Sequence, residues 1–362
     1  MYLKELFIDN FRNLKKQKIE FSNKINILYG KNAQGKSNIL EIIRLLSIGK
    51  SFRNSKNNEM VNYNSSYFYI KGVFDDDIDK KIIEISYKKD QNRVIRINNN
   101  KIKYTIQLVG NILTTIFSPE DLNIIKGSPS IRRRYIDTTI SMIRRNYLYN
   151  LLQYNKVLYN RNKLLKELRF NSSNKELLNI LDEQIVNYGS KIILYRQQYI
   201  KNLDIVIKKL LYDISGENAN LKYENNINID TENIIDIKSK YLDNLKNSQK
   251  NDIKYCQTQF GPHRDDFKFN INGYNSKIYS SQGQQRTAVL CLKLGEQEII
   301  LKETGSKPIL LLDDVMSELD MDRQKYIYNM IQGSQVIITH VDKKDIDGNK
   351  YLHIQDGFIN EE

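Results

Sequence analysis

Residues 30 to 37, GKNAQGKS, lie between two apolar runs and contain two glycines, the second of which is followed directly by Lys36 and Ser37. The stretch ILYGKNAQGKSNIL, residues 27–40, fits the pattern G-x-x-x-x-G-K-[ST]. Phosphate oxygens need several donors within a small radius, and Gly30 and Gly35 allow the backbone N–H groups of the loop to turn inward together. Apolar residues then follow at helical spacing, and a helix N-terminus attracts anions. The pattern predicts a phosphate-binding loop rather than an ordinary turn between strand and helix.

Two side chains of this loop have expected roles of their own. Lys36 is expected to reach the outer phosphates of a nucleotide and to act in catalysis, and the Ser37 hydroxyl is expected to join the shell of Mg²⁺. The predicted nucleotide-binding residues of the loop are Gly30, Lys31, Asn32, Ala33, Gln34, Gly35, Lys36, Ser37 and Asn38.

A second segment, KPILLLDDVMSELD at residues 307–320, ends an apolar run in two acids. Ligands of open α/β sheets bind at the carboxyl ends of the strands, where Asp313 and Asp314 would lie. Asp313 is expected to hold Mg²⁺ directly or through water, and Asp314 to polarise an attacking water as the catalytic carboxylate. The alternative is a turn that ends the strand, since Asp is common in turns.

Between these segments, SSQGQQRTAVLCLKLGEQEIIL begins at residue 280. Its small polar residues precede an expected helix from about Gln285 to Thr304, which makes a second candidate anion site. The residues concerned are Ser281, Gly283, Gln284 and Gln285. An ordinary helix cap would also explain them, but their place 28 positions before Asp313 (313 minus 285) favours a nucleotide role.

Lys36 and Asp313 are 277 positions apart (313 minus 36), so the nucleotide fold must be split by an insertion. Apolar residues spaced by three and four run through residues 136–158 and again through 181–203, with NSSN at 171–174 between them. This spacing predicts two long helices of about 35 residues each, folded back on each other. We expect an ATPase core at 1–130 and 255–362, an antiparallel β meander at about 67–106, and an inserted helical lobe at 131–254. The part between about 216 and 254 yields no clear element.

Taken in order, these motifs resemble the ATPase heads of the ABC superfamily, and within it the RecF family of bacterial recombination and gap-repair proteins. The segments that resemble the RecF family are NFRNL at 10–14, FSPEDLNIIKGSPSIRRRYID at 117–137, QFGPHRDDF at 259–267 and SSQGQQRTAVLCLKL at 280–294. The resemblance covers nearly the whole chain. It implies an α/β fold, an ABC-type P-loop ATPase head with an antiparallel β lobe and an inserted helical lobe.

The resemblance also implies a site shared between two subunits. Two ATP molecules would be enclosed, with Ser281 and Gly283 of one subunit facing the γ-phosphate held by Lys36 of the other. By position, Asp320 of SELD would contact the partner beside the nucleotide. Three further expectations remain open: His340 near the γ-phosphate, Arg12 beside the nucleotide or as an exposed structural arginine, and a Q-loop near residues 117–121.

A formal net charge of +13 and a pI near 9.3 favour a polyanionic partner, although a general richness in lysine would also raise them. The best local candidates for DNA phosphates are Arg132, Arg133, Arg134, Arg144 and Arg145, with Tyr147 stacking on an exposed base. Arg133 or Arg134 could instead pair with acids of the core. His263, Asp265 and Asp266 could suggest a metal, but without a further His or Cys nearby we interpret GPHRDDF as structural.

The chain is therefore expected to be a cytoplasmic ATP-dependent DNA-binding protein with slow hydrolysis. Its two cysteines form no disulfide framework, and MYLKELFIDN is too charged for a signal peptide. By resemblance, it would dimerise on ATP at single-stranded, gapped or junction DNA and help mediators (RecR and RecO) to load recombinase, with no membrane partner. The rival interpretations are a nucleotide-binding subunit of an ABC transporter, a P-loop metabolic kinase and an ABC-like head fused to a nuclease.

Overall fold

The computed structural model describes residues 1–76, 79–170, 175–315, 320–342 and 348–361. The chain divides into two compact units. Unit 1 is Met1–Asp121 with Glu296–Glu362, and unit 2 is Leu122–Gly295. The predicted insertion lies inside unit 2, which continues past residue 254. It does so because β10 (Asp266–Ile271) pairs antiparallel with β9 (Ala219–Glu224), so the chain after the helices is still part of the same unit.

The first sheet of unit 1 is built mainly from parallel strands. Its order is β15-β14-β3-β13-β12-β8, in which β3 (Ile25–Tyr29), β13 (Val336–His340), β12 (Ile309–Asp313) and β8 (Thr114–Phe117) run parallel. β14 (Lys350–Gln355) is parallel to β3, and β15 (Phe358–Glu361) closes the edge antiparallel. The central strands β12 and β13 are buried at every position, as expected where a parallel sheet is covered on both faces.

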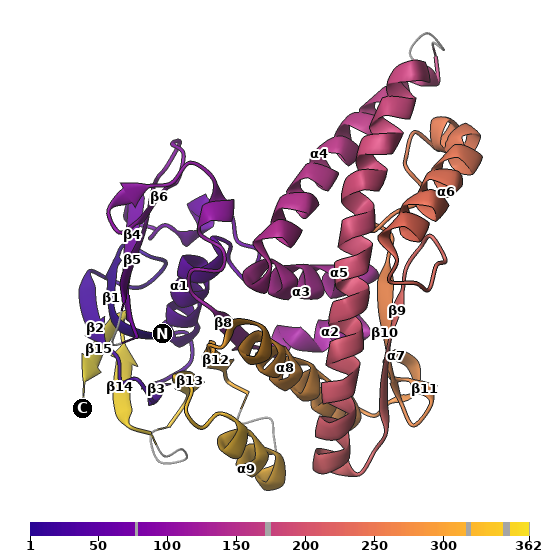
Figure 1. Ribbon diagram of the computed structural model, residues 1–362. Helices are drawn as coiled ribbons and strands as arrows, with labels where there is room; N and C mark the ends of the chain where they lie inside the picture. Colours follow the sequence, from indigo (N-terminus) through magenta and orange to yellow (C-terminus); the bar gives the residue numbers. More distant parts are fainter. Residues whose placement is uncertain (77–78, 171–174, 316–319, 343–347, 362) are drawn as a thin grey trace. The chain divides into compact units, whose positions relative to one another are not determined.

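The second sheet of unit 1 is antiparallel, with order β2-β1-β4-β5-β6-β7. It contains β1 (Tyr2–Asp9), β2 (Gln17–Glu20) and the predicted meander, β4 (Tyr67–Asp75), β5 (Lys80–Lys88), β6 (Val94–Ile97) and β7 (Asn100–Lys101). Helix α1 (Lys36–Ile48) contacts strands of both sheets and lies between them in Figure 1. Ten of its thirteen residues are buried, which explains the dense apolar pattern after Ser37.

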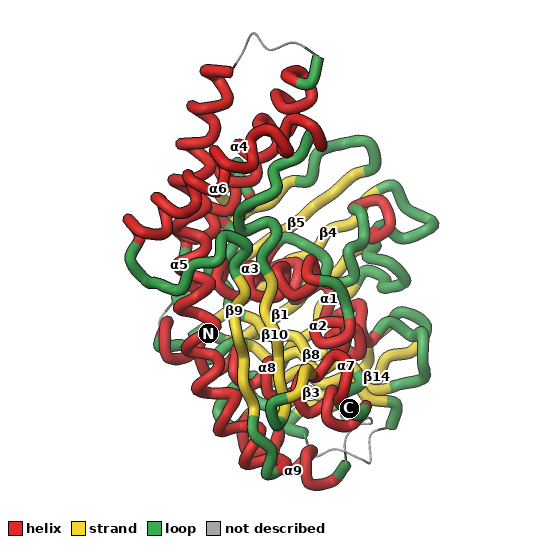
Figure 2. The backbone as a smooth tube through the Cα atoms, turned by 90° about the vertical axis from the view of Figure 1, so that its right-hand side faces the viewer, coloured by secondary structure: helices red, strands yellow, loops and turns green. Residues whose placement is uncertain are grey.

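Unit 2 is a helical assembly packed on a small sheet. Figure 2 shows its long helices as red tubes beside the yellow strands β9 and β10. The sheet has the order β11-β10-β9, with β11 at Tyr274–Asn275. The helices are α2 (Leu122–Lys126), α3 (Pro129–Ile143), α4 (Arg145–Leu168), α5 (Lys175–Ser215), α6 (Ile234–Tyr255), α7 (Ser276–Tyr279) and the first part of α8 (Gln282–Thr304). In unit 1, α9 spans Met321–Met330.

The helical pair differs from its prediction in two ways. The apolar spacing continues through Arg144, but this residue is extended (φ −133°, ψ 96°) and separates α3 from α4. The second helix has 41 residues rather than about 35. The region from 216 to 254, which gave no clear element, contains β9 and α6. None of the helices in the described ranges has the length and apolarity that crossing a bilayer would require.

In unit 2, the backbone at Gly261, just before β10, packs closely against two tyrosine side chains. Gly261 has a left-handed φ of 131°, and a Cβ there would overlap the hydroxyl oxygen of Tyr241 and lie 2.6 Å from that of Tyr154. Both tyrosines are buried, Tyr154 on α4 and Tyr241 on α6. The backbone at Gly261 therefore ties two helices of the unit together.

We expect Gly261→Ala to lower the free energy of unfolding by about 2–4 kcal/mol, because it adds both backbone strain and overlap in the core. Gly273→Ala is the matched control. Its φ is also positive, at 85°, but a Cβ there meets nothing within 4 Å, so about 1 kcal/mol is expected. Urea denaturation measures both, and equal losses would contradict the packing argument.

Candidate nucleotide-binding site

Parallel pairing brings the predicted nucleotide residues of unit 1 to one edge of its sheet. In the observed register Asp313 on β12 faces Thr339 on β13, and His340 faces Tyr29 at the end of β3. The loop that starts at Gly30 therefore leaves the same edge of the sheet as the acidic pair, with β13 between them. Phe117, where the Q-loop was expected, ends β8 next to Leu312. This is the edge at which α/β sheets bind ligands.

The loop of residues 30–37 requires glycine at both fixed positions, because neighbouring residues of unit 1 leave no space for a side chain there. Gly30 has φ 141°, and a Cβ there would overlap the carbonyl oxygen of Ile354. Gly35 has φ 115°, and a Cβ would lie 2.8 Å from Leu14 Cδ2. Ala33 is also left-handed, with φ 66°. At Gly30 and Gly35 the positive φ and the close neighbours together leave room for glycine alone.

Lys36 opens α1 and folds back over the loop. Its ammonium donates to the carbonyl oxygens of Gly30 and of Lys31, the latter at 3.0 Å, which uses two of its three donors. Burial lowers the pKa of Lys36, and the nearby carboxylates of Asp314 and Asp313 act in the opposite direction. Lys36 is thus placed between the loop and the acidic pair.

Other residues of the loop and of the first turn of α1 form hydrogen bonds with residues distant in sequence. Lys31, Asn32 and Ala33 are exposed, and Ser37 is half-buried in the first turn of α1. The Gln34 side chain accepts a hydrogen bond from the Asp356 backbone N–H at 2.6 Å. Asn38 donates to the side chain of Asn13 at 2.7 Å, within the NFRNL segment. The NFRNL segment therefore positions the loop, a role that its sequence did not predict.

Arg12 makes its contacts inside unit 1. Its guanidinium forms a bidentate ion pair with Glu41 of α1, at 2.6 and 2.8 Å, and donates to Ser55 Oγ at 2.6 Å. Glu41 has no exposed surface, so the pair compensates a buried charge. Arg12 thereby acts as a structural arginine beside the loop, and an approach to nucleotide remains a proposal.

A threonine that sequence reasoning missed holds the two acids in place. Thr339 Oγ1 donates to Asp313 Oδ1 at 3.0 Å and accepts from the Asp314 backbone N–H at 2.9 Å. Asp313 is buried, whereas Asp314 is exposed and has a left-handed φ of 54°. The signal was available, because Thr339 occupies the end of the apolar run VIITH that pairs with β12.

His340 and Asp320 make local contacts in unit 1. His340 is buried, and its Nδ1 lies 2.9 Å from the carbonyl oxygen of Asp342. Asp320 caps α9 by accepting from the Arg323 backbone N–H at 2.9 Å. The preceding residues of the SELD motif, Ser317, Glu318 and Leu319, lie outside the described residues.

The second predicted anion site belongs to unit 2 and begins one turn earlier than expected, because α8 starts at Gln282. Ser281 and Gln284 form a reciprocal cap: Gln284 N–H donates to Ser281 Oγ at 3.2 Å, and Ser281 N–H donates to Gln284 Oε1 at 2.8 Å. The Gln285 side chain is buried and donates to the carbonyl oxygens of Ser276 and Ser280. Ser281 and Gly283 are exposed.

The five arginines predicted to contact DNA differ in their exposure to solvent. Arg132 is buried and pairs bidentately with Asp266, at 2.6 and 2.8 Å, so its inclusion in the DNA set is corrected. Arg133 donates to the Asp265 carbonyl oxygen at 2.7 Å, and burial lowers its pKa. Arg134, Arg144 and Arg145 have exposed side chains.

The stacking role of Tyr147 is also wrong. Its ring is fully buried, and its hydroxyl bonds to Asp137 at 2.5 Å and to Arg196 at 3.1 Å. The apolar spacing that drew attention to Tyr147 belongs to the buried side of α4, so this ring faces the core of unit 2 rather than solvent.

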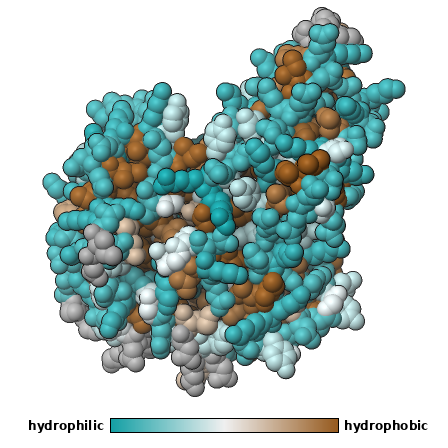
Figure 3. All heavy atoms as spheres, in the orientation of Figure 1, coloured by the Kyte–Doolittle hydropathy of each residue, from teal (hydrophilic) through white to brown (hydrophobic). Residues whose placement is uncertain are grey.

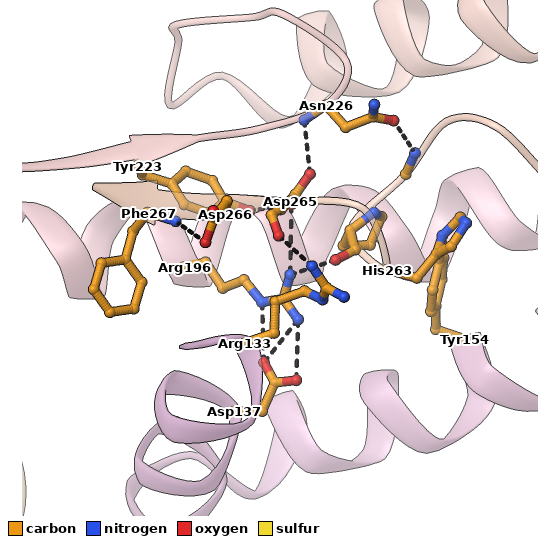
Figure 4. A network of polar contacts seen from close by, with 12 residues as sticks. Arg133, Asp137, Tyr154, Arg196, Tyr223, Asn226, His263, Asp265, Asp266 and Phe267 are labelled. Atoms are coloured by element: carbon orange, nitrogen blue, oxygen red, sulfur yellow. Dashed lines mark hydrogen bonds and ion pairs between the residues drawn. The ribbon is translucent and has the colours of Figure 1, made fainter. Parts of the chain in front are cut away.

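Figure 4 shows the polar network that uses the acids of GPHRDDF. Arg196 of α5 pairs with Asp137 at 2.8 Å and donates to the Pro262 carbonyl oxygen at 2.6 Å. The buried carboxylate of Asp265 accepts from the Tyr223 hydroxyl and from the Asn226 backbone N–H. The interpretation of GPHRDDF as structural is confirmed by these contacts. Within the described ranges, no group of three or more His, Cys, Asp or Glu residues is arranged to hold a metal.

The fold and this edge of the sheet define an ABC-type P-loop ATPase head. A family model for the RecF/RecN/SMC N-terminal domain matches residues 2–354. The chain is 55% identical to the DNA replication and repair protein RecF of Thermoanaerobacter sp. (strain X514) over 99% of both chains, and 42% identical to that of Clostridium tetani over 97% of this chain and 95% of the relative. The chain belongs to the RecF family.

Solved structures agree with this assignment. The structure of the recombination mediator protein RecF-ATP in the RecFOR pathway has a TM-score of 0.96 and 51% identity, and the comparison covers 99% of this chain and 97% of that one. An Smc head bound to the C-terminal winged-helix domain of ScpA has a TM-score of 0.56 and 16% identity over 100% and 97% of the two chains, which shows a shared fold alone.

His263 provides a test of the polar network in unit 2. Its Nδ1 lies 2.6 Å from the Tyr154 hydroxyl, and its Nε2 lies 3.1 Å from the Thr258 carbonyl oxygen. A carbonyl only accepts, so Nε2 carries the proton and Nδ1 accepts from Tyr154. Burial lowers the pKa of His263 to about 4 from its ordinary 6.5.

Because the unfolded chain binds this proton at higher pH than the folded chain does, stability is expected to fall as pH drops from about 6.5 to 4, by about 3 kcal/mol in total. His263→Gln should remove this component while the carboxylate contributions remain. Denaturant unfolding of both proteins at several pH values measures it. Parallel pH curves for the two would rule out a buried neutral histidine.

Proposed function

We propose that the chain is an ATP-controlled DNA-binding switch of recombinational gap repair and replication restart. The phosphate-type loop and the acidic pair lie at one edge of the sheet in unit 1, which supports nucleotide binding there. Membership of the RecF family, whose relatives are named as DNA replication and repair proteins, supports the DNA role. A solved relative named as RecF-ATP supports ATP as the nucleotide.

ATP would lie with its phosphates in the loop of residues 30–37, where backbone N–H groups, Lys36 and the N-terminus of α1 meet the charge. Mg²⁺ suits the donors at this edge, because they are hard oxygens: the Ser37 hydroxyl and the Asp313 carboxylate. Thr339 donates a hydrogen bond to Oδ1 of Asp313 and so helps to hold this carboxylate in place. When bound, Mg²⁺ would neutralise phosphate charge.

Hydrolysis would give ADP and phosphate. The exposed carboxylate of Asp314 belongs to a residue whose backbone is held by Thr339, and it would polarise the attacking water. A slow turnover fits a protein that uses ATP to time its association rather than to drive continuous work. His340, Asp320 and the segment 117–121 are proposed to sense or border the nucleotide.

One observation carries the proposal that two copies share each nucleotide. A Cβ added at Gly283 would meet only the Ser281 hydroxyl oxygen, at 3.9 Å, and Gly283 lacks a left-handed φ. Its own chain therefore places no demand for glycine there, unlike Gly30 and Gly35. A glycine that the chain itself does not require leaves room for another molecule to approach the backbone. We assign that molecule as the γ-phosphate held by Lys36 of a second copy.

For DNA, the exposed Arg134, Arg144 and Arg145, with Arg133 as a partly buried neighbour, are proposed to contact backbone phosphates. The dimer would form on single-stranded, gapped or junction DNA in the cytoplasm. It would help recombination mediators such as RecR and RecO to place recombinase, and release on hydrolysis.

Lys36→Ala is expected to weaken ATP binding by tenfold or more, since each charge-assisted hydrogen bond that the change removes is worth about 1.5–3 kcal/mol. Lys50→Ala is the matched control, with the same change of charge at an exposed position of unit 1 outside the predicted loop. Titration with a fluorescent ATP analogue measures both. Unchanged affinity in Lys36→Ala would refute the assignment of the phosphate loop.

Ser281→Arg should leave ATP binding intact and prevent ATP-dependent dimerisation, because the longer cation would fill the space beside Gly283. Ser306→Arg, at an exposed position outside the predicted site, should dimerise normally. Sedimentation velocity with and without ATP and Mg²⁺ distinguishes the two. A dimer that survives Ser281→Arg would eliminate the shared site.

A further inference from the structure

Helix α4 of unit 2 has an exposed line of residues that the nucleotide site does not use. Starting at Arg145, positions at alternating intervals of four and three fall on the same side of the helix. They are Arg145, Tyr149, Leu152, Lys156, Tyr159 and Lys163, and all six are exposed. We call this set the α4 stripe. The opposite side of α4 is buried and includes Tyr154 and Arg161.

Both tyrosine rings of the stripe are exposed to solvent. Tyr159 is 72% exposed and Tyr149 is 50% exposed, while Tyr147 and Tyr154 on the buried side are at most 1% exposed. Tyr149 has a partner, since its ring meets that of Tyr188 of α5 edge-on with centroids 6.4 Å apart. Figure 3 shows hydrophobic and hydrophilic areas side by side on the helical part of unit 2. Along the stripe, Lys156 separates Tyr149 and Leu152 from Tyr159, so the rings do not form one continuous apolar patch.

The charges of α4 favour a polyanion as the occupant. The stripe holds three cations and no acid, and the only acidic residue in the whole helix is Glu167. A docking face for another protein's helix would bring apolar residues together at intervals of three and four. Here cations lie at both ends of the stripe and between its two rings, with Leu152 as the one aliphatic residue. Proteins bind single strands with such a combination: cations follow the phosphates, and aromatic faces stack on bases.

We propose that the α4 stripe binds single-stranded DNA by stacking bases on Tyr149 and Tyr159, with Arg145, Lys156 and Lys163 on the phosphates. The proposal rests on the DNA-binding function proposed above and adds its surface and its preference. A duplex keeps its base faces stacked inside, so only an unpaired strand can use the rings. From Arg145 to Lys163 the helix rises about 27 Å, enough for roughly eight stacked nucleotides.

Fluorescence anisotropy of the full chain with a labelled oligothymidylate of about 15 nucleotides tests the rings. Tyr159→Ala is expected to weaken binding roughly five- to 150-fold, the range for loss of one base-aromatic stack. Tyr159→Phe keeps the ring and should stay within about twofold of the unsubstituted chain. Tyr212→Ala is the control, because it removes a tyrosine that is 62% exposed on α5 and lies off the stripe.

The double variant Lys156→Gln, Lys163→Gln tests the cations. It should reduce the slope of log affinity against log salt by about 1.4, because each phosphate of a single strand that is no longer neutralised lowers the slope by about 0.7. Binding of a blunt duplex should change less in Tyr159→Ala than binding of the single strand does. Circular dichroism of each variant checks that α4 still folds.

The outcomes separate this proposal from the function on which it rests. If the unsubstituted chain binds the oligonucleotide while Tyr159→Ala and the double lysine variant bind it equally well, the α4 stripe is not the surface, and the DNA-binding function stands. If the unsubstituted chain binds neither single-stranded nor gapped DNA, with or without ATP, the proposed function itself fails.

Discussion

The parallel register of three strands is the constraint on which the site depends. β3, β13 and β12 end together, so the phosphate-type loop and the acids at 313 and 314 meet although 277 positions separate Lys36 from Asp313. Thr339, on the strand between them, bonds to both acids and keeps their roles distinct: Asp313 buried, Asp314 exposed. Any shift of β13 against β12 would move this threonine to the wrong partner. Every later step, from metal to attacking water, assumes that alignment.

Unit 2 depends on a different interaction: its buried arginines are paired with aspartate carboxylates. Arg161 pairs with Asp182 and Asp252, and Arg196 with Asp137, all within a helical core. Removing one partner of such a pair leaves an uncompensated buried charge, which costs several kcal/mol, so these contacts restrict how the helices can pack. A helical unit fixed in this way can present the N-terminus of α8 and the exposed side of α4 in a defined geometry. That is what both proposed contacts, with nucleotide and with DNA, require.

Much of unit 1 could be predicted from the sequence, because its signals are local. The phosphate-type loop, the apolar strand before Asp313 and the meander each follow from a short pattern, and α1 from dense apolar residues. What failed depends on tertiary context. Apolar spacing cannot report the extended backbone at Arg144, nor that Tyr147 faces the core and Arg132 meets Asp266 across 134 positions. The roles of Asn13 and Thr339 also required the fold, since each acts through a residue distant in sequence.

The central claim is that two copies complete one nucleotide site, and a mixing experiment tests it most directly. The Lys36→Ala and Ser281→Arg variants are each expected to be unable to assemble alone. Mixed, they can form one intact site per pair, with Lys36 from one chain and Ser281 from the other. The account predicts that ATP-dependent association and phosphate release reappear in the mixture, at a fraction of the unsubstituted level. A mixture as inactive as its separate components would contradict it.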